Sequence, residues 1–381
     1  MTHFLLLTAF IIVMTCLQAT SSKKIAVYNS RINPEIQPAK KDRGIFMIIA
    51  MAIMMLLTAL RSENVGNDTP EYIRIFNEII SNPDYINVTR FEVGYVFLNQ
   101  IVGKFTTNPQ GILIVVAIIQ YTIFIWFFLK HSKNYALTTV LFFILSFGST
   151  LNIVRQTLAM AFVFIAFDRV LDKKIIGAIF WIIIATLFHN SAIITLVLVL
   201  LPYIKFDKVF VIILLGLCGL FAFSDLLYKM CMLVAPSYAH YFSGQYAESG
   251  WLAVTYQLLS NFIFFVVILL AVIFVKKHKK GILDGKLRYN QQNNLVLWIS
   301  FAAFAGFILG YKINLVDRLI SYFTIYSIIF LPNALQKYDR TSRIILSCGI
   351  VGVLIAYSIV VLKLRPEWNT IYPYTFFWQV G

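Results

Sequence analysis

The chain has 381 residues, of which 60% are hydrophobic and 13% are charged. A soluble domain is nearer half apolar and a quarter charged, and one membrane span needs about 20 predominantly apolar residues. Apolar blocks of that kind recur from Phe4 to Leu362. They exclude a soluble enzyme, a secreted disulfide scaffold, a disordered chain and a β-barrel of alternating strands. The expected fold class is all-α, a polytopic membrane helical bundle.

In chain order, the apolar blocks predict about twelve transmembrane helices in one membrane domain, residues 1–381. The blocks lie at about 4–20, 44–60, 111–129, 135–150, 153–170, 175–188, 190–203, 208–224, 252–275, 293–310, 315–332 and 344–362. The first block follows no basic segment and precedes no clear small-x-small cleavage site, so we expect a retained span rather than a signal peptide.

The loops between the blocks indicate the orientation of the bundle. The net charge is +15, from 32 Lys and Arg against 17 Asp and Glu. Basic residues gather in alternate loops, above all about 21–43 and about 276–292. The positive-inside rule places these loops in the cytoplasm and the loops at about 61–110 and 225–251 outside. The excess of basic charge therefore indicates membrane orientation, and no nucleic-acid partner is expected.

Two stretches do not fit a simple crossing. The segment 92–105 is short and starts with Glu92. A full crossing there would place Lys130 and Lys133 outside, so an interfacial or re-entrant helix is predicted. The block 175–203 has lysines before and after it, so both of its ends are expected inside. Two short helices should therefore meet at a polar break at 188–191, on the outer half of the membrane.

Two predicted outer helix starts carry an arginine in the first turn. Each has an asparagine as the expected N-cap and polar neighbours, with Asn152, Arg155 and Gln156 in one and Asn314, Asp317 and Arg318 in the other. The helix dipole disfavours a cation at this end unless an anion answers it. Helix N-termini with guanidinium groups make phosphate sites. Alternatively, each arginine snorkels to the headgroups and Asp317 is only a salt-bridge partner of Arg318.

Other polar residues near the predicted outer side have two interpretations each. His189 lies at the predicted break, where an imidazole can act as base, acid or donor, or can simply satisfy broken backbone. Glu92 opens a helix that dips towards apolar surroundings, so a raised pKa and a role as base are expected, with helix N-capping as an equal alternative. Asp68 fits an N-cap before an acidic first turn. Arg61 suits the carboxyl end of a helix.

Several catalytic signatures are missing from the sequence. It contains no Walker loop, HExxH, Asp-x-Asp or Gly-x-Ser-x-Gly motif, and no GxGxxG between a strand and a helix. The four cysteines lie far apart, mostly within apolar runs. No metal site, disulfide framework or cofactor is therefore expected.

An ordered set of motifs resembles the EpsG family of Wzy-like polysaccharide polymerases over almost the whole chain. The motifs are Leu60-Arg61, Val65-Gly66-Asn67-Asp68-Thr69 with Tyr72, Glu92-x-Gly94-Tyr95, Arg155-Gln156, Phe188-His189-x-Ser191-Ala192, Asp317-Arg318 and Tyr372-Pro373-Tyr374-x-Phe376. Each motif alone is weak, and their order carries the resemblance. A threonine or similar residue often precedes the aspartate of the second motif in the family, where this chain has Asn67.

The resemblance implies a glycosyltransferase of the bacterial inner membrane with its active site facing the periplasm or outer face. It would join glycan repeat units carried on undecaprenyl diphosphate, for O-antigen, capsule or exopolysaccharide. Its partners would be this lipid-linked oligosaccharide and membrane lipid, with a chain-length regulator and a flippase as further candidates. Glu92 or His189 would take the acceptor proton. The diphosphate ligands would be Arg155, Arg318 and Arg61, supported by Asp68, Gln156 and Asp317.

Three other functions compete with polymerisation. A flippase or transporter needs polar groups along a path through both leaflets, whereas the inner halves of these spans are almost free of charge except for Asp168 near Arg169. A ligase that moves finished glycan to a final acceptor would use the same donor site, so the sequence keeps it open. A non-catalytic scaffold leaves the two first-turn arginines unexplained.

Overall fold

A computed structural model describes residues 44–82, 91–226, 251–278, 283–311, 315–364 and 370–379. It also describes Lys229, Met232 and Leu233. Within these residues the structure is helical, and extended backbone pairs in an isolated bridge between Arg61 and Phe376. The all-α class is therefore confirmed for this part of the chain. The predicted first span and the basic loop 21–43 lie outside the described residues, as do Asn314 and most of the loop at 225–251.

The chain forms two compact units. The first comprises residues 1–165, 183–190 and 340–381, and the second comprises 166–182 and 191–339. Two helices, α8 (Val154–Leu171) and α9 (Ile175–Phe188), run from one unit into the other.

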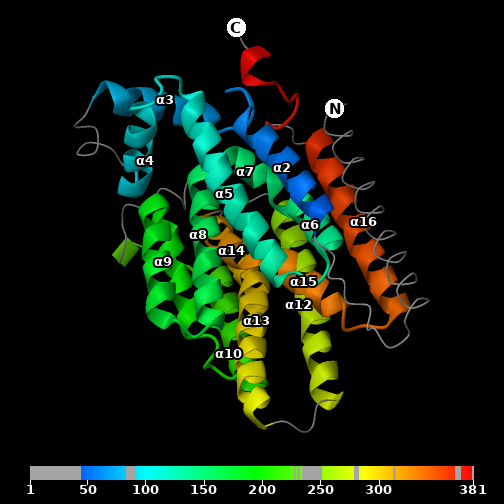
Figure 1. Cartoon of the computed structure of the whole chain (residues 1–381). Coiled ribbons are helices and arrows are strands. Elements are labelled where there is room, and N and C mark those ends of the chain that lie inside the picture. The colour runs from blue at the N-terminus through cyan, green and yellow to red at the C-terminus, as the bar shows by residue number, and fades with distance from the viewer. Residues whose placement is uncertain are drawn as a thin grey trace. The chain divides into compact units, whose positions relative to one another are not determined.

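The first unit is built around α5, a long apolar helix. Its elements besides the parts of α8 and α9 are α2 (Ile45–Ala59), α3 (Thr69–Ser81), α4 (Val93–Gly103), α5 (Gln110–His131), α6 (Tyr135–Leu145), α7 (Phe147–Asn152), α16 (Arg340–Leu364) and η6 (Phe377–Gln379). Helix α5 packs along α2, and α3 packs against α4 (Figure 1). Aromatic rings fill this core, with Phe127 and Phe164 stacked at 4.1 Å between ring centroids.

The second unit has α13 at its centre. Its elements are η2 (Asn190–Val199, of which Asn190 belongs to the first unit), α10 (Lys208–Phe223), α12 (Trp251–His278), α13 (Leu283–Gly310), α14 (Leu315–Thr324) and α15 (Ser327–Leu335). Helix α13 packs against α10, α12 and α14, and α12 also packs against α15. Phe206 and Trp298 meet edge to face at 4.7 Å in this unit.

Five helices of the described residues are long and apolar enough to cross a membrane, judged by length and composition. They are Gln110–His131, Ala253–Ile273, Gln291–Gly310, Val316–Leu335 and Arg340–Leu364. Shorter apolar helices accompany them, including Ile45–Ala59 and Lys208–Phe223. Together they indicate a multi-pass membrane protein. The count of about twelve crossings and the single membrane domain stay predictions.

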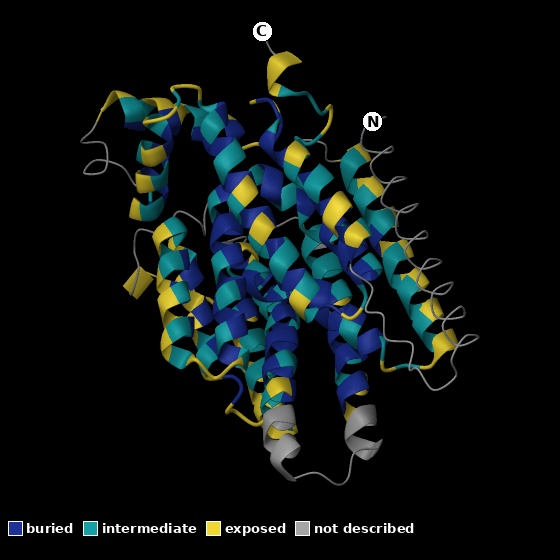
Figure 2. Ribbon diagram, viewed as in Figure 1, coloured by how far each residue is buried: buried dark blue, intermediate teal, exposed yellow. Residues whose placement is uncertain are grey.

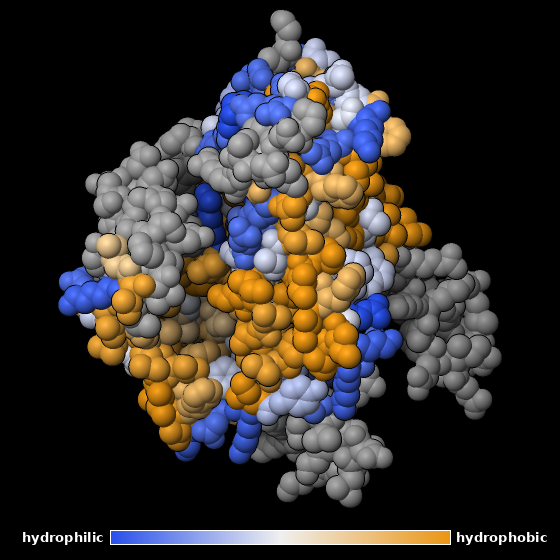
Figure 3. All heavy atoms as spheres, turned by 90° about the vertical axis from the view of Figure 1, so that its left-hand side faces the viewer, coloured by the Kyte–Doolittle hydropathy of each residue, from blue (hydrophilic) through white to orange (hydrophobic). Residues whose placement is uncertain are grey.

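Apolar side chains on the surface agree with a lipid environment. Helix α16 is intermediate or exposed along its length, with Leu354 as its buried residue (Figure 2). Hydrophobic side chains form a broad area of the face drawn in Figure 3. On α9, Ile176 is 86% exposed, Phe180 is 54% exposed and Ile183 is 50% exposed, a row of large apolar side chains that a water-facing helix seldom exposes.

The break predicted at 188–191 is confirmed. Helix α9 ends at Phe188, and η2 follows from Asn190 as a 3₁₀ helix, so His189 stands between the two. The short helix predicted after Glu92 is also confirmed as α4, which has 11 residues. The depth of both segments in a membrane stays a prediction.

The expected N-cap role of Asn152 is wrong. Asn152 is the last residue of α7, and α8 begins at Val154 after Ile153. The side-chain oxygen of Asn152 instead accepts a hydrogen bond from the backbone N–H of Asp68, at 3.0 Å. It therefore satisfies an amide at the start of α3, one of the unpaired groups that every helix N-terminus leaves.

Candidate functional site

Three predicted site residues from distant segments meet in the first unit. Glu92 precedes α4, Arg155 lies in the first turn of α8, and His189 follows α9. Nη1 of Arg155 donates to Oε2 of Glu92. Oε1 of Glu92 accepts the backbone N–H of Asn190 at 3.1 Å and lies 3.2 Å from Nδ1 of His189. One carboxylate thus contacts two other segments of the unit, and we call these three residues the Glu92 cluster.

A glycine permits this close approach. A Cβ atom added to Gly94 would lie 2.7 Å from the carbonyl oxygen of Leu187 and 2.9 Å from its Cβ. These distances are shorter than real Cβ contacts allow, so only glycine lets the first turn of α4 approach the end of α9 so closely. The approach brings Glu92, two residues before Gly94, to His189, two residues after Leu187.

Glu92 is ionised in this environment. Burial opposes its ionisation, since its side chain is 6% exposed, but the neighbouring His189, the charge of Arg155 and backbone N–H donors outweigh burial. Together they lower its pKa from 4.5 to about 2. The raised pKa expected from the sequence is therefore wrong, because that expectation counted burial without the partners. The side chain of Glu92 makes no N-cap hydrogen bond either.

His189 is partly accessible. Its side chain is 17% exposed, whereas Nδ1 is buried and faces Glu92. Nδ1 lies 3.2 Å from Oε1 of Glu92, but its direction does not suit a hydrogen bond. The exposure therefore falls on atoms other than Nδ1, and Nδ1 is the ring nitrogen that faces the carboxylate.

Arg155 is held on more than one side. The centre of its guanidinium lies 4.4 Å from the ring centroid of Phe91, a cation–π contact. Tyr72 also interacts with it: burial raises the pKa of the Tyr72 hydroxyl, and the charge and hydrogen bonding of Arg155 oppose the rise. Tyr72 in turn meets Tyr95 edge to face, with 5.9 Å between centroids. The positive charge of Arg155 at the N-terminus of α8 is therefore compensated by Glu92 of the same chain.

Tyr72 and Tyr95 were not predicted as site residues. Both are buried and pack with Val154 and Leu158 of α8 in one hydrophobic cluster. The only sequence signal was their place in the ordered motifs, because a tyrosine in an apolar helix is usually a packing residue.

Arg61 lies beside the carboxyl end of α2 and is buried, with 1% exposed. It donates to the carbonyl of Thr58, and its Nε donates to Oγ1 of Thr69 at 3.2 Å. Burial lowers its pKa from 12.5 to about 10. The helix-end interaction expected for Arg61 is confirmed, since a cation near free carbonyls opposes the helix dipole. Its Nη2 is buried without a hydrogen-bond partner.

The loop before α3 depends on another glycine. Gly66 has φ of +89°, and an added Cβ would lie 2.3 Å from the carbonyl oxygen of Leu151. Asp68 precedes α3, with Pro70 at its start and Glu71 in its first turn, as predicted. The side chain of Asp68 makes no cap hydrogen bond, so only the position of the predicted N-cap is right.

The remaining predicted residues belong to different units, Gln156 to the first and Asp317 and Arg318 to the second. Gln156 is buried in α8, 2% exposed. Asp317 and Arg318 are in the first turn of α14, as predicted, and both are exposed. They belong to the second unit, whereas the Glu92 cluster belongs to the first.

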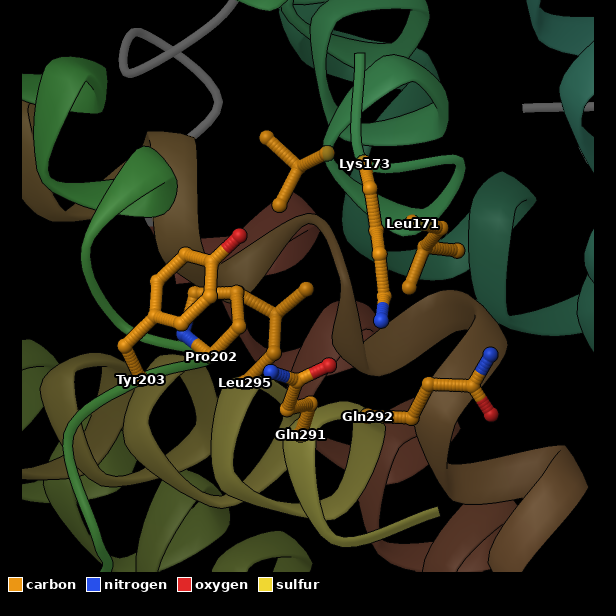
Figure 4. Close-up of a pocket in the computed structure, with 8 residues that line it drawn as sticks. Leu171, Lys173, Pro202, Tyr203, Gln291, Gln292 and Leu295 are labelled. Atoms are coloured by element: carbon orange, nitrogen blue, oxygen red, sulfur yellow. The ribbon is translucent and has the colours of Figure 1, made fainter. Parts of the chain in front are cut away.

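A small pocket lies within the second unit. Lys173, Tyr203 and Gln291 line it together with apolar groups such as Leu295 (Figure 4). No residue of the Glu92 cluster lines it. Across the part of the chain that the structure describes, no three or more His, Cys, Asp or Glu side chains gather as metal ligands would.

Comparison with known proteins identifies a family. The model of the EpsG family, a Wzy-like polymerase family, matches residues 44–376. That range contains all of the predicted site residues. No curated protein and no solved structure matches the chain.

Proposed function

The chain belongs to the EpsG family, whose Wzy-like polymerases act in polysaccharide biosynthesis, and on that premise we propose that it joins glycan repeat units carried on undecaprenyl diphosphate. The reaction takes place at the outer face of the bacterial inner membrane and extends an O-antigen, capsule or exopolysaccharide. The observation that best supports this proposal is the Glu92 cluster, in which an ionised carboxylate, a guanidinium and a partly exposed imidazole are fixed together.

In the proposed reaction the growing glycan leaves its lipid diphosphate. The bond between its anomeric carbon and the phosphate oxygen breaks, and a new bond forms to a hydroxyl oxygen of the incoming unit. The hydroxyl proton passes to a base. We assign this role to His189 because its ring is partly exposed, and we assign to Glu92 the orientation of that ring. A carboxylate that stays ionised with both oxygens engaged is a poor base but a good orienting partner.

The departing diphosphate needs positive charge. Arg318 is exposed in the first turn of α14, so its guanidinium and the helix N-terminus can contact phosphate oxygens directly. Arg155 is already paired with Glu92, and we propose that it adds its remaining donors and fixes the cluster. Arg61 is buried and contributes positive potential. Asp68, Gln156 and Asp317 are assigned a supporting role, because Gln156 and Asp317 are sequence neighbours of Arg155 and Arg318 and Asp68 precedes the helix of Tyr72.

A deletion strain tests the proposed reaction. Without this protein, cells should still make single lipid-linked repeat units and attach at most one to the final acceptor. Mass spectrometry of extracted lipid-linked glycans and gel ladders of the polymer would show this. Normal long polymer would contradict polymerisation, loss of outward-facing single units would favour a flippase, and long lipid-linked chains that stay untransferred would favour a ligase.

A further inference from the structure

The C-terminal segment 370–379 is fastened to the loop between α2 and α3. The backbone N–H of Ser62 donates to the carbonyl of Thr375 at 2.9 Å, and that of Phe377 donates to the carbonyl of Leu60 at 3.0 Å. These two bonds flank the bridge between Arg61 and Phe376. Figure 1 draws this segment in red near the end of α2.

Side chains strengthen the same junction. The hydroxyls of Ser62 and Thr375 lie 2.6 Å apart, and Thr370 donates to the side-chain oxygen of Asn67 at 2.7 Å. The hydroxyl of Tyr374 donates to the carbonyl of Leu57 at 2.6 Å, a group that the end of α2 leaves unpaired. The segment is therefore held in one conformation at several points along its length.

This fixed segment presents an aromatic corner. Trp378 stacks on Phe376 with 4.5 Å between ring centroids and 7° between planes. Phe377 stands at 79° to Trp378, with 5.0 Å between centroids. The rings of Trp378 and Phe377 are therefore nearly perpendicular to each other. Trp378 nevertheless stays 58% exposed and Phe377 stays 36% exposed, so both rings remain accessible.

The chemistry of the corner suits a sugar ring. A pyranose has a face of C–H groups that packs on an aromatic ring and an edge of hydroxyls that needs polar partners. Polar side chains surround the junction: Glu63, Asn64 and Asn67 are exposed in the loop to which the segment is bonded. An interfacial aromatic belt is the alternative role for rings beside the end of an apolar helix, and the affinity of Trp378→Leu for oligosaccharide separates the two roles.

We propose that Trp378 and Phe377 form a carbohydrate-binding subsite that holds a sugar of the glycan chain. The inference rests on the proposed polymerase function and deepens it. The subsite is bonded to the loop that carries Arg61, and Thr69, which Arg61 contacts, begins the helix of Tyr72. Because the rings are already fixed in place, little conformational entropy is lost when a sugar binds.

Trp378→Leu tests the subsite because leucine keeps an apolar surface but removes the stacking face. The full chain is placed in phosphatidylglycerol nanodiscs, and lipid-free oligosaccharide released from the host polysaccharide by mild acid is titrated into it. The dissociation constant should rise about tenfold, a change of about 1.4 kcal/mol. Trp378→Tyr should restore most of the affinity, and Phe105→Leu, at an aromatic residue that is 86% exposed elsewhere in the unit, should leave it unchanged.

Kinetics with lipid-linked units give the second measurement. The KM should rise with Trp378→Leu while kcat stays within about twofold, because the subsite binds the glycan but does not contact the reacting atoms. Unchanged affinity and KM in Trp378→Leu would overturn the subsite and leave a membrane-interface role for the ring. If the wild-type chain binds the oligosaccharide but extends no lipid-linked unit, the polymerase proposal fails and the subsite stands.

Discussion

Helices α8 and α14 start with the same sequence pattern in different surroundings. Each has an arginine in its first turn, where the helix dipole disfavours a cation. Arg155 is 20% exposed and is held by Glu92 and Phe91. Arg318 is exposed, with Asp317 in the same turn. The comparison teaches that a misplaced cation in the sequence calls for an anion but does not say whether the chain or a ligand supplies it.

The difference suggests a division of roles. A guanidinium that is fixed by a carboxylate and an aromatic ring can organise other groups around it. A guanidinium at an exposed helix start can exchange its partners and so contact a passing diphosphate. Substitutions at the two helix starts and in the Glu92 cluster can separate these roles.

His189→Gln should reduce the rate of polymerisation most. Loss of a general base typically costs about 10²- to 10⁴-fold, and glutamine cannot accept a proton at neutral pH. The rate would be measured with purified lipid-linked units, together with protein abundance in membranes. His131→Gln, at the end of α5 in the same unit, is the matched control. A rate within about tenfold of wild type would remove His189 from the role of base.

Arg155→Lys and Arg318→Lys compare the two helix starts directly. If each guanidinium supports the departing diphosphate, lysine should fail nearly as badly as alanine, by about 30- to 1000-fold. Lysine keeps the charge but loses the planar, two-pronged contact. For Arg155 the loss also includes the contact with the Phe91 ring.

Polymer ladders and protein abundance would be measured for both lysine variants. A normal ladder from Arg318→Lys alone would show that this residue only snorkels to headgroups, where lysine serves equally well. Normal ladders from both variants would show that neither arginine binds the diphosphate.

Sequence reasoning predicted the elements better than the contacts between them. The short helix after Glu92 and the break at His189 followed from loop charges and polar residues within apolar runs, and the structure has both. The all-helical class followed from composition. Helix positions and breaks depend on the residues of the segment itself, so hydrophobic periodicity and charge in the sequence indicate them directly.

The errors arose where a distant segment supplies the partner. Glu92 has a lowered pKa because Arg155 and His189 come to it from other segments of the chain. Asn152 serves the start of α3 rather than its own helix because the Gly66 loop passes it. One sequence without covarying positions cannot reveal such pairings, since each partner obeys its own local pattern.

Glu92→Gln separates an orienting carboxylate from a catalytic base. The rate should fall about 10- to 100-fold, the range found when a carboxylate that orients a metal-ligating histidine is lost. Since the pKa of Glu92 is about 2, the carboxylate is ionised throughout the range of about pH 5 to 8, so an acid limb in the pH–rate profile of the wild type belongs to another group and should persist in the variant. Disappearance of an acid limb in this variant would show that Glu92 titrates as the base after all.

The same pKa predicts the acid stability of the first unit. The lowered pKa of Glu92 stabilises the fold above about pH 4.5, and this contribution is lost as the pH falls through about 2. The thermal midpoint of wild type should therefore decline more than that of Glu92→Gln between these pH values. Parallel declines would mean that the ion pair with Arg155 contributes little to folding.

Cysteine substitutions in the loops should have the smallest effect on activity. Their labelling tests whether the starts of α8 and α14 face the same side of the membrane. In a chain whose native cysteines are replaced, Asn64→Cys reports the loop near the Glu92 cluster, and Lys312→Cys reports the sequence just before α14. Both should react with an impermeant thiol reagent on intact cells, and Arg340→Cys at the start of α16 should react only after permeabilisation. One diphosphate can contact Arg155 and Arg318 only if both helix starts reach the same aqueous side. Protection of Lys312→Cys with labelling of Asn64→Cys would separate the arginines across the bilayer, and the diphosphate would then belong to one of them alone.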